Sequence, residues 1–211
     1  AILHLLITPL YCWTFLWTLG YHGVFAVILF NLFLTTSTTL WDLYSIWAAD
    51  YQYIINFATW INIGNNNIIN FAISGTFMST VLLVIMTCGS FIVLNFVYIE
   101  MWDDKEGANF AILLTLFLGF MGILVSSANL FIFYLGWEGI GLVSLFLINF
   151  WSERARAIKA TLKVYTINKV GDFFIFSGIC LLFVNLGQTN IIFLNTISPI
   201  INNYYILIGN T

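Results

Sequence analysis

Glu138 is an acidic residue in the middle of a segment that is otherwise almost wholly apolar, NLFIFYLGWEGIGLVSLFLINFW (129–151). A segment of this length and hydrophobicity is typical of a transmembrane helix. At 1.5 Å of rise per residue, we expect the carboxyl group to lie roughly 18–20 Å from the inner end of that helix, near mid-membrane. A charge there costs at least about 2.5–3.5 kcal/mol on insertion scales. We therefore predict a role in proton transfer; the alternative is a protonated or hydrogen-bonded acid that joins two helices.

A second acid, Asp172, is predicted at a similar depth on the next helix. Lys169 precedes it by three residues, so the two side chains can meet on one helix face. Asp172 also ends a polar stripe with 4-3-4 spacing, formed by Thr161, Tyr165 and Asn168. Such a stripe would suit a water-wetted proton entry. It would equally suit a buried seam against a neighbouring helix, with Lys169 extending toward the membrane surface.

The residues around Glu138 are small or polar. Gly136, Gly139 and Gly141 remove side chains from the turn that holds the acid, which permits close approach by another helix. Gly141 and Tyr134 are expected on the same face as the carboxyl group. We expect no Lys, Arg or His elsewhere in the chain at the depth of Glu138, so its cation is predicted to come from another polypeptide segment.

The composition determines the class of protein. The 211 residues are 61% hydrophobic and only 7% charged, whereas a soluble domain has about 25% charged residues. We predict an all-α polytopic membrane protein with about six transmembrane helices, surrounded by lipid. The net charge of −3 gives no indication of nucleic-acid binding. The three cysteines lack metal-binding or redox spacing, so no metal site is predicted.

The expected elements form one bundle over residues 1–211. A segment at about 51–74 has a different composition, with β-branched and aromatic residues on both sides of GNNN. This pattern predicts a β-hairpin outside the bilayer. We expect a non-spanning connector at about 185–203 and the start of a seventh helix near 204. The expected helices lie at 1–19, from 24, and at 75–100, 108–125, 129–150 and 161–184.

The basic residues predict the orientation of the bundle. Five of the six lie in or just beyond one loop, and Lys105 is expected on the same face. Short loops rich in Lys and Arg face the inner side of the membrane. The hairpin is then expected to face outward. The five are Arg154, Arg156, Lys159, Lys163 and Lys169.

Two stretches carry a family resemblance. The first, LVSSANLFIFYLGWEGIGLVSLFLINFW, resembles the fifth-helix signature of the chain-5 antiporter-like subunits of NADH–ubiquinone oxidoreductase (respiratory complex I). The second, YTINKVGDFFIF, resembles the sixth helix of that family, and the similarity runs from about residue 60 to 193. The chain departs from the family pattern at Ser74, where an acid usually opens the third helix, and at Ala128, where an acid or Asn often stands.

The resemblance implies a bundle of transmembrane helices in inverted repeats. It implies that Glu138, Lys169 and Asp172 carry protons, and that a lysine on helix seven is coupled to the glutamate. That lysine would come from the remaining part of a chain-5 subunit, of which this sequence would be the N-terminal part, as a split gene product or a trimmed polypeptide. The partners implied are other membrane-arm subunits.

The resemblance also implies where the protein is located and which subunits bind the cofactors. FMN, iron–sulfur clusters and ubiquinone are expected in partner subunits, with no cofactor in this chain. The expected location is the mitochondrial inner membrane, with a bacterial plasma membrane as the alternative. Two other functions stay open: a subunit of a multisubunit Na⁺/H⁺ antiporter, and a purely structural piece of the membrane arm.

Overall fold

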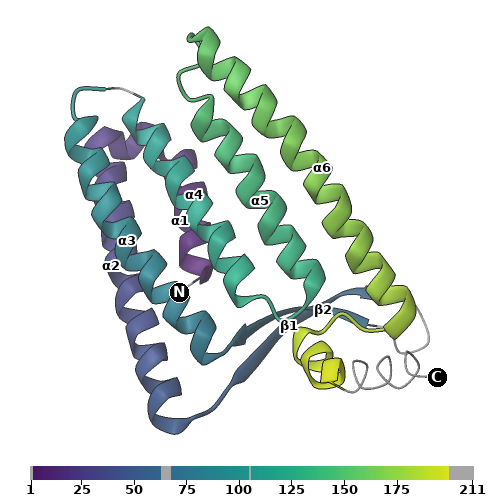
Figure 1. The fold of residues 1–211 in the computed structure, drawn as a ribbon. Helices are drawn as coiled ribbons and strands as arrows, with labels where there is room; N and C mark the ends of the chain where they lie inside the picture. Colours follow the sequence, from purple (N-terminus) through teal and green to yellow (C-terminus); the bar gives the residue numbers. More distant parts are fainter. Residues whose placement is uncertain (1, 63–67, 105, 200–211) are drawn as a thin grey trace.

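The computed structural model describes residues 2–62, 68–104 and 106–199. Its helices and strands form a helical bundle with a two-stranded hairpin at one end (Figure 1). In chain order they are α1 (Ile2–Thr14), α2 (Leu16–Ala49), β1 (Tyr53–Asn62), β2 (Ile68–Gly75), α3 (Phe77–Glu100), α4 (Gly107–Ser126), α5 (Leu130–Ile148) and α6 (Ala155–Leu186).

Five helices are long and apolar enough to cross a membrane among the described residues: Thr18–Ala49 of α2, and α3, α4, α5 and α6. The prediction of a helical polytopic membrane protein with a small hairpin is confirmed. The first expected run is divided, however. It forms the 13-residue α1, which is shorter than the roughly 20 residues that a span needs, and the start of α2. Gly20 breaks α2 with φ 64°, a left-handed conformation that glycine adopts without steric cost.

The core of the bundle lies between α1, α2, α3 and α4. Phe25, Ile28 and Leu32 of α2 are almost fully buried there, together with Leu94 of α3 and Ala111 of α4. Outward-facing side chains of the same helices remain apolar, such as Ile85, Ile92 and Ile99 of α3. A helix that is apolar on all sides suits a lipid surrounding.

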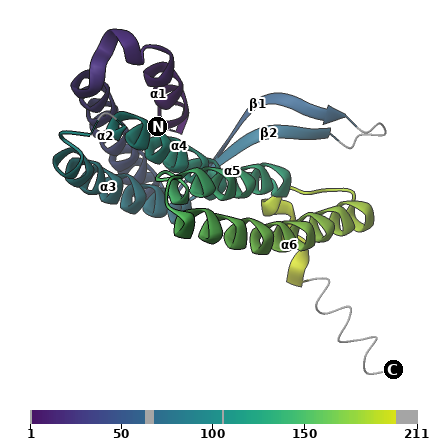
Figure 2. The ribbon, with the colours of Figure 1, turned by 90° about the horizontal axis from the view of Figure 1, so that it is seen from above.

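The hairpin is antiparallel and is fixed to the bundle through β2. Ile73 pairs with Ser127, and the backbone N–H of Ala128 donates to the carbonyl of Ala72, so β2 is held by the turn between α4 and α5. Figure 2 shows β1 as the outer strand, on the far side of β2 from α5. The GNNN turn that the sequence predicts lies outside the described residues.

The last helical segments differ from the expected bounds. α6 begins at Ala155, whereas the sequence predicts a connecting segment up to Thr161, so the basic residues from Arg156 onward are helical. Arg156 and Lys159 therefore lie in the first turns of α6, whereas Lys163 and Lys169 fall within the helix that the sequence predicts. Residues 191–199 are also helical, within the expected connector. The seventh helix expected from 204 lies outside the described residues.

Candidate functional site

The site lies where α5 packs between α4 and α6. α5 approaches α4 closely because two of its residues lack side chains. A Cβ atom added at Gly136 would lie 2.7 Å from the backbone nitrogen of Leu124, and one at Gly139 would lie 2.2 Å from the ring of Phe120. The predicted close approach therefore applies at these two glycines. Gly141 differs, because an added Cβ would meet no atom within 4 Å.

The start of α5 is fixed by Asn129. Its side-chain oxygen accepts a hydrogen bond from the backbone N–H of Ile132 at 2.9 Å, which caps the helix. Its amide group donates to the backbone carbonyl of Asn70 in β2 at 2.6 Å. The Asn129 side chain thus connects the first turn of α5 to the hairpin. It thereby fixes how far from the hairpin Glu138 lies, about two turns further along α5.

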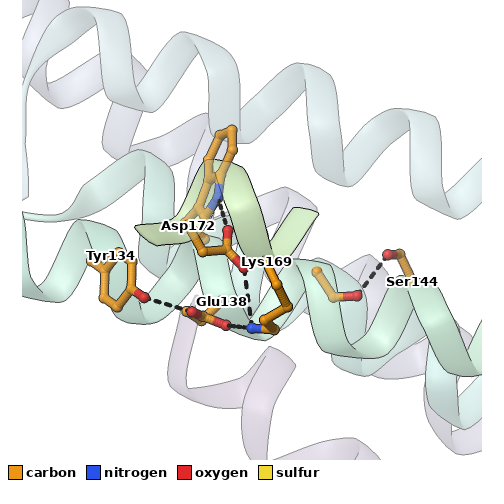
Figure 3. Close-up of polar contacts among 7 residues, drawn as sticks. Tyr134, Glu138, Ser144, Lys169 and Asp172 are labelled. Carbon is orange, nitrogen blue, oxygen red and sulfur yellow. Dashed lines mark hydrogen bonds and ion pairs between the residues drawn. The ribbon is translucent and has the colours of Figure 1, made fainter. Parts of the chain in front are cut away.

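Glu138, Lys169 and Asp172 form one ionic cluster between α5 and α6 (Figure 3). The ammonium Nζ of Lys169 lies 2.6 Å from Oε2 of Glu138 and 3.1 Å from Oδ2 of Asp172. This geometry corrects the expectation that Glu138 lacks a cation in this chain. The sequence predicts Lys169 in or just beyond a basic loop near the membrane surface. In the structure, α6 begins already at Ala155, so Lys169 lies well inside the helix and its ammonium reaches Glu138.

The three charges differ in exposure. The side chain of Asp172 is 9% exposed, that of Glu138 31% and that of Lys169 44%. Asp172 is therefore enclosed by this chain alone. The Lys169 end of the cluster stays open on the surface of α5 and α6, so another segment has access to it.

Two aromatic residues on α5 complete the cluster. The hydroxyl of Tyr134 donates a 2.6 Å hydrogen bond to Oε1 of Glu138, across one helical turn, which agrees with the predicted shared face. The indole Nε1 of Trp137 donates to Oδ1 of Asp172 at 2.9 Å. Sequence reasoning missed Trp137. A signal was present, because an indole N–H in an apolar segment needs a hydrogen-bond acceptor.

The polar stripe on α6 is only partly sheltered. Thr161 and Asn168 are half-buried, in line with the buried Asp172, whereas Tyr165 is 47% exposed. The hydroxyl of Thr161 donates to the carbonyl of Ala157 in its own helix. The stripe thus leads from the basic end of α6 toward the cluster, with Tyr165 at its outer edge. Among the described residues, no three His, Cys, Asp or Glu side chains converge as a metal site would require.

The fold and the site together define a polytopic helical membrane protein with an acid–lysine cluster between its helices α5 and α6. Residues 127–210, which include Glu138, Lys169 and Asp172, match the family described as NADH:quinone oxidoreductase/Mrp antiporter, TM. The predicted resemblance to the antiporter-like chain-5 subunits is confirmed by this match and by the similar proteins below.

Several curated relatives are named NADH-ubiquinone oxidoreductase chain 5. That of Dictyostelium discoideum is 31% identical over 175 residues, which is 83% of this chain and 26% of the relative. That of Wickerhamomyces canadensis is 34% identical over 193 residues, 90% of this chain and 30% of the relative. The chain thus spans less than a third of the length of these relatives.

Two solved structures share the fold. One is the archaeal membrane-bound sulfane sulfur reductase, a respiratory membrane complex, with a TM-score of 0.73 and 18% identity. The other is respiratory complex I from Thermus thermophilus with bound aureothin, with a TM-score of 0.69 and 16% identity. Each match covers 90% of this chain, and 39% and 38% of the respective neighbour. At these identities the comparisons establish the arrangement of the helices.

Proposed function

We propose that this chain is a proton-translocating subunit of the membrane arm of an NADH:ubiquinone oxidoreductase. The observation that carries the proposal is the sharing of one ammonium, that of Lys169, between the carboxylates of Glu138 and Asp172. With both acids ionised, the cluster holds two negative charges and one positive charge. One carboxylate can therefore take up a proton without leaving the ammonium unpaired.

Movement of Lys169 would decide which acid takes the proton. A carboxylate without a counter-ion in a poorly solvated site favours its protonated form, whereas an adjacent ammonium favours the ionised form. If the Lys169 ammonium moves fully to Asp172, Glu138 loses its counter-ion and binds a proton. If the ammonium returns, Glu138 releases the proton. Tyr134 stays hydrogen-bonded to Glu138 and holds its carboxyl group in place during this cycle.

A further cation from a neighbouring segment would drive that movement. Lys169 and Glu138 are partly exposed on the open face of α5 and α6, so a basic residue from the rest of a chain-5 subunit could approach them. In this proposal the redox groups, FMN, iron–sulfur clusters and ubiquinone, are bound by other subunits, which form the enzyme with this chain in the mitochondrial inner membrane. The name of the curated relatives, NADH-ubiquinone oxidoreductase chain 5, supports the assignment to such a complex.

The test is proton pumping by the assembled complex that carries Glu138→Gln. This change keeps the size of the side chain and removes its titration. We expect NADH oxidation with a lower number of protons translocated per electron. The matched control is Glu153→Gln, an exposed acid between α5 and α6, which should leave the ratio unchanged. An unaltered ratio for Glu138→Gln in a fully assembled complex would refute the proposal.

The family description also includes Mrp antiporters. Proton movement measured with and without NADH should separate the two functions. A Na⁺/H⁺ antiporter subunit would exchange protons for sodium in vesicles without NADH. For the function that we propose, proton movement should require NADH oxidation and should stop when that oxidation is inhibited.

A further inference from the structure

The turn between α5 and α6 and the first turns of α6 carry most of the positive charge of this chain. Residues 151–163, at the end of the bundle opposite the hairpin (Figure 1), contain four basic residues and one acid, whereas the whole chain has a net charge of −3. Within the described parts of the chain, none of the four forms an ion pair with a carboxylate. Their charge is therefore available to an anion from outside the chain. The four are Arg154, Arg156, Lys159 and Lys163, and all are exposed.

The contact between Lys169 and Glu138 shows at what level these basic residues lie. α5 and α6 are antiparallel neighbours (Figure 1). Moving from this contact toward the turn by the same number of residues on both helices brings Lys159 to the level of Ile148, where α5 ends. Trp151 follows in the turn with an exposed indole ring, which is typical of the level at which a membrane meets water. The basic residues thus lie at or near the level of the phospholipid headgroups.

A groove at this turn joins the positive charge to an apolar wall. The groove is open and has a volume of about 730 Å³. The guanidinium of Arg154 lies 5.9 Å from the centroid of the Trp151 ring, a cation–π contact that orients it beside the groove. A guanidinium presents paired N–H donors, which match two oxygens of a phosphate. The groove is lined by two arginines and four apolar residues: Arg154, Arg156, Ile148, Trp151, Ala155 and Ala157.

One face of α6, which we call the lipid face, is basic at its start and apolar further along. It begins with Arg156, Lys159 and Lys163, which follow one another at intervals of three and four residues. Three strongly exposed apolar side chains continue the same spacing, so all six residues lie on one side of the helix. A phospholipid has its groups in the same order, with the phosphate at the membrane surface and the acyl chains below it. The three apolar residues are Ile167, Val170 and Phe174.

We propose that the groove and the lipid face of α6 bind an anionic phospholipid, with its phosphate at the guanidinium groups of Arg154 and Arg156 and an acyl chain along the apolar part of the face. A soluble anion would use the guanidinium groups alone and leave the apolar residues uncovered. A zwitterionic phospholipid has the same acyl chains, but four nearby cations repel its own positive group. Each Lys or Arg at the membrane surface adds to the attraction for an anionic lipid.

α3 provides an internal control for this site. It also presents an exposed apolar face and ends on the side of the bundle opposite the hairpin (Figure 1). Acids follow that face at the membrane surface, where the lipid face of α6 has cations. An anionic phospholipid should therefore prefer α6, whereas a zwitterionic one should contact both helices alike. The apolar residues of α3 are Ile85, Ile92 and Ile99, and the acids are Glu100, Asp103 and Asp104.

The experiment uses the assembled complex that contains this chain, reconstituted into nanodiscs of phosphatidylcholine. A minor fraction of the lipid carries a photoactivatable diazirine in its acyl chain, either as anionic phosphatidylglycerol or as zwitterionic phosphatidylcholine. After illumination, mass spectrometry of the cross-linked peptides gives the ratio of anionic to zwitterionic labelling at each helix. We expect this ratio to be several-fold higher on the lipid face of α6 than on α3. The measurement needs no proton pumping, so its result is independent of the proposed function.

Two double variants test the arginines. Arg154→Gln with Arg156→Gln should lower the labelling ratio of α6 to near that of α3, because it removes both guanidinium charges. Arg154→Lys with Arg156→Lys keeps the charges and should retain part of the excess. The α3 ratio is the reference in every sample. An unchanged α6 ratio in the glutamine variant would overturn the assignment of the phosphate to these arginines.

Two results for the unaltered chain would overturn the lipid site itself. One is an equal labelling ratio on α6 and α3, which would show that α6 does not select the charge of the lipid. The other is a lipid face of α6 that neither probe labels while α3 is labelled, which would show that a protein segment covers it.

Discussion

Trp137 on α5 donates its indole N–H to Oδ1 of Asp172 on α6, and Lys169 contacts the other oxygen, Oδ2, of the same carboxylate. Asp172 is therefore held from two sides, by a neutral donor from one helix and a charged donor from its own. Because both oxygens are engaged, the carboxylate is fixed in orientation, while the ammonium remains shared with Glu138. Trp137 follows Gly136 and precedes Glu138, so the same turn of α5 provides the close approach, the indole donor and the acid.

Trp137→Phe should weaken proton pumping more than assembly. The change keeps an aromatic ring against Phe133 but removes one hydrogen bond to a carboxylate, which contributes about 1.5–3 kcal/mol. We expect the assembled complex to be recovered in near-normal amount and to pump several-fold more slowly. Pumping by the assembled complex measures this. A normal pumping rate would show that the indole N–H has no part in holding Asp172. Phe133→Leu, which removes the stacked ring and leaves the hydrogen bond, is the control.

Lys169→Met should abolish pumping, and Lys169→Arg should retain part of it. Both carboxylates contact the same ammonium; without it two like charges remain close together, which favours protonation of one of them. Arginine keeps the positive charge but holds it in a rigid planar group. We expect at least a tenfold loss for methionine and a smaller loss for arginine, measured as protons per electron. Lys159→Met, on the exposed first turns of α6, is the control and should pump normally.

How much of this site the sequence alone could predict depends on the range of each contact. The contacts within one helix, Tyr134 with Glu138 and Lys169 with Asp172, follow from spacings of four and three residues. The pairing of Lys169 with Glu138 does not, because it depends on the register of α5 against α6. That register is set by the length of the turn between them and by the early start of α6 at Ala155.

The packing of the glycines could likewise be predicted only in part. Their spacing indicates a close helix approach, but only the packing of α5 on α4 decides which of them faces the neighbour. Gly136 and Gly139 do, and Gly141 does not. The polar stripe on α6 likewise required the structure, because Thr161, Asn168 and Asp172 turn inward while Tyr165 lies at the edge. Trp137 was missed because it belongs to no periodic pattern.

Gly136→Ala should destabilise the bundle, and Gly141→Ala should not. The added methyl group at position 136 would lie 2.7 Å from the backbone of Leu124, which cannot move without shifting α4. Inserting atoms into a close-packed interface costs about 1–3 kcal/mol. We expect a lower yield of assembled complex, quantified on native gels. Gly141→Ala adds its methyl group in open space, so an equal loss for both variants would refute the assignment of the interface.

Asn129→Ala should loosen the start of α5 and thereby the level at which Glu138 is held. The change removes a helix cap, which contributes about 1 kcal/mol, and the hydrogen bond to the Asn70 carbonyl in the hairpin. We expect faster hydrogen–deuterium exchange at the first turn of α5 and at β2. Asn149→Ala provides the matched control at the other end of α5, because its side-chain oxygen is buried without a hydrogen-bond partner among the described residues. Its loss should leave exchange at the first turn unchanged. If Asn129→Ala exchanged no faster than Asn149→Ala, the Asn129 side chain would not anchor α5 to the hairpin, and the position of Glu138 would depend on the other contacts of α5.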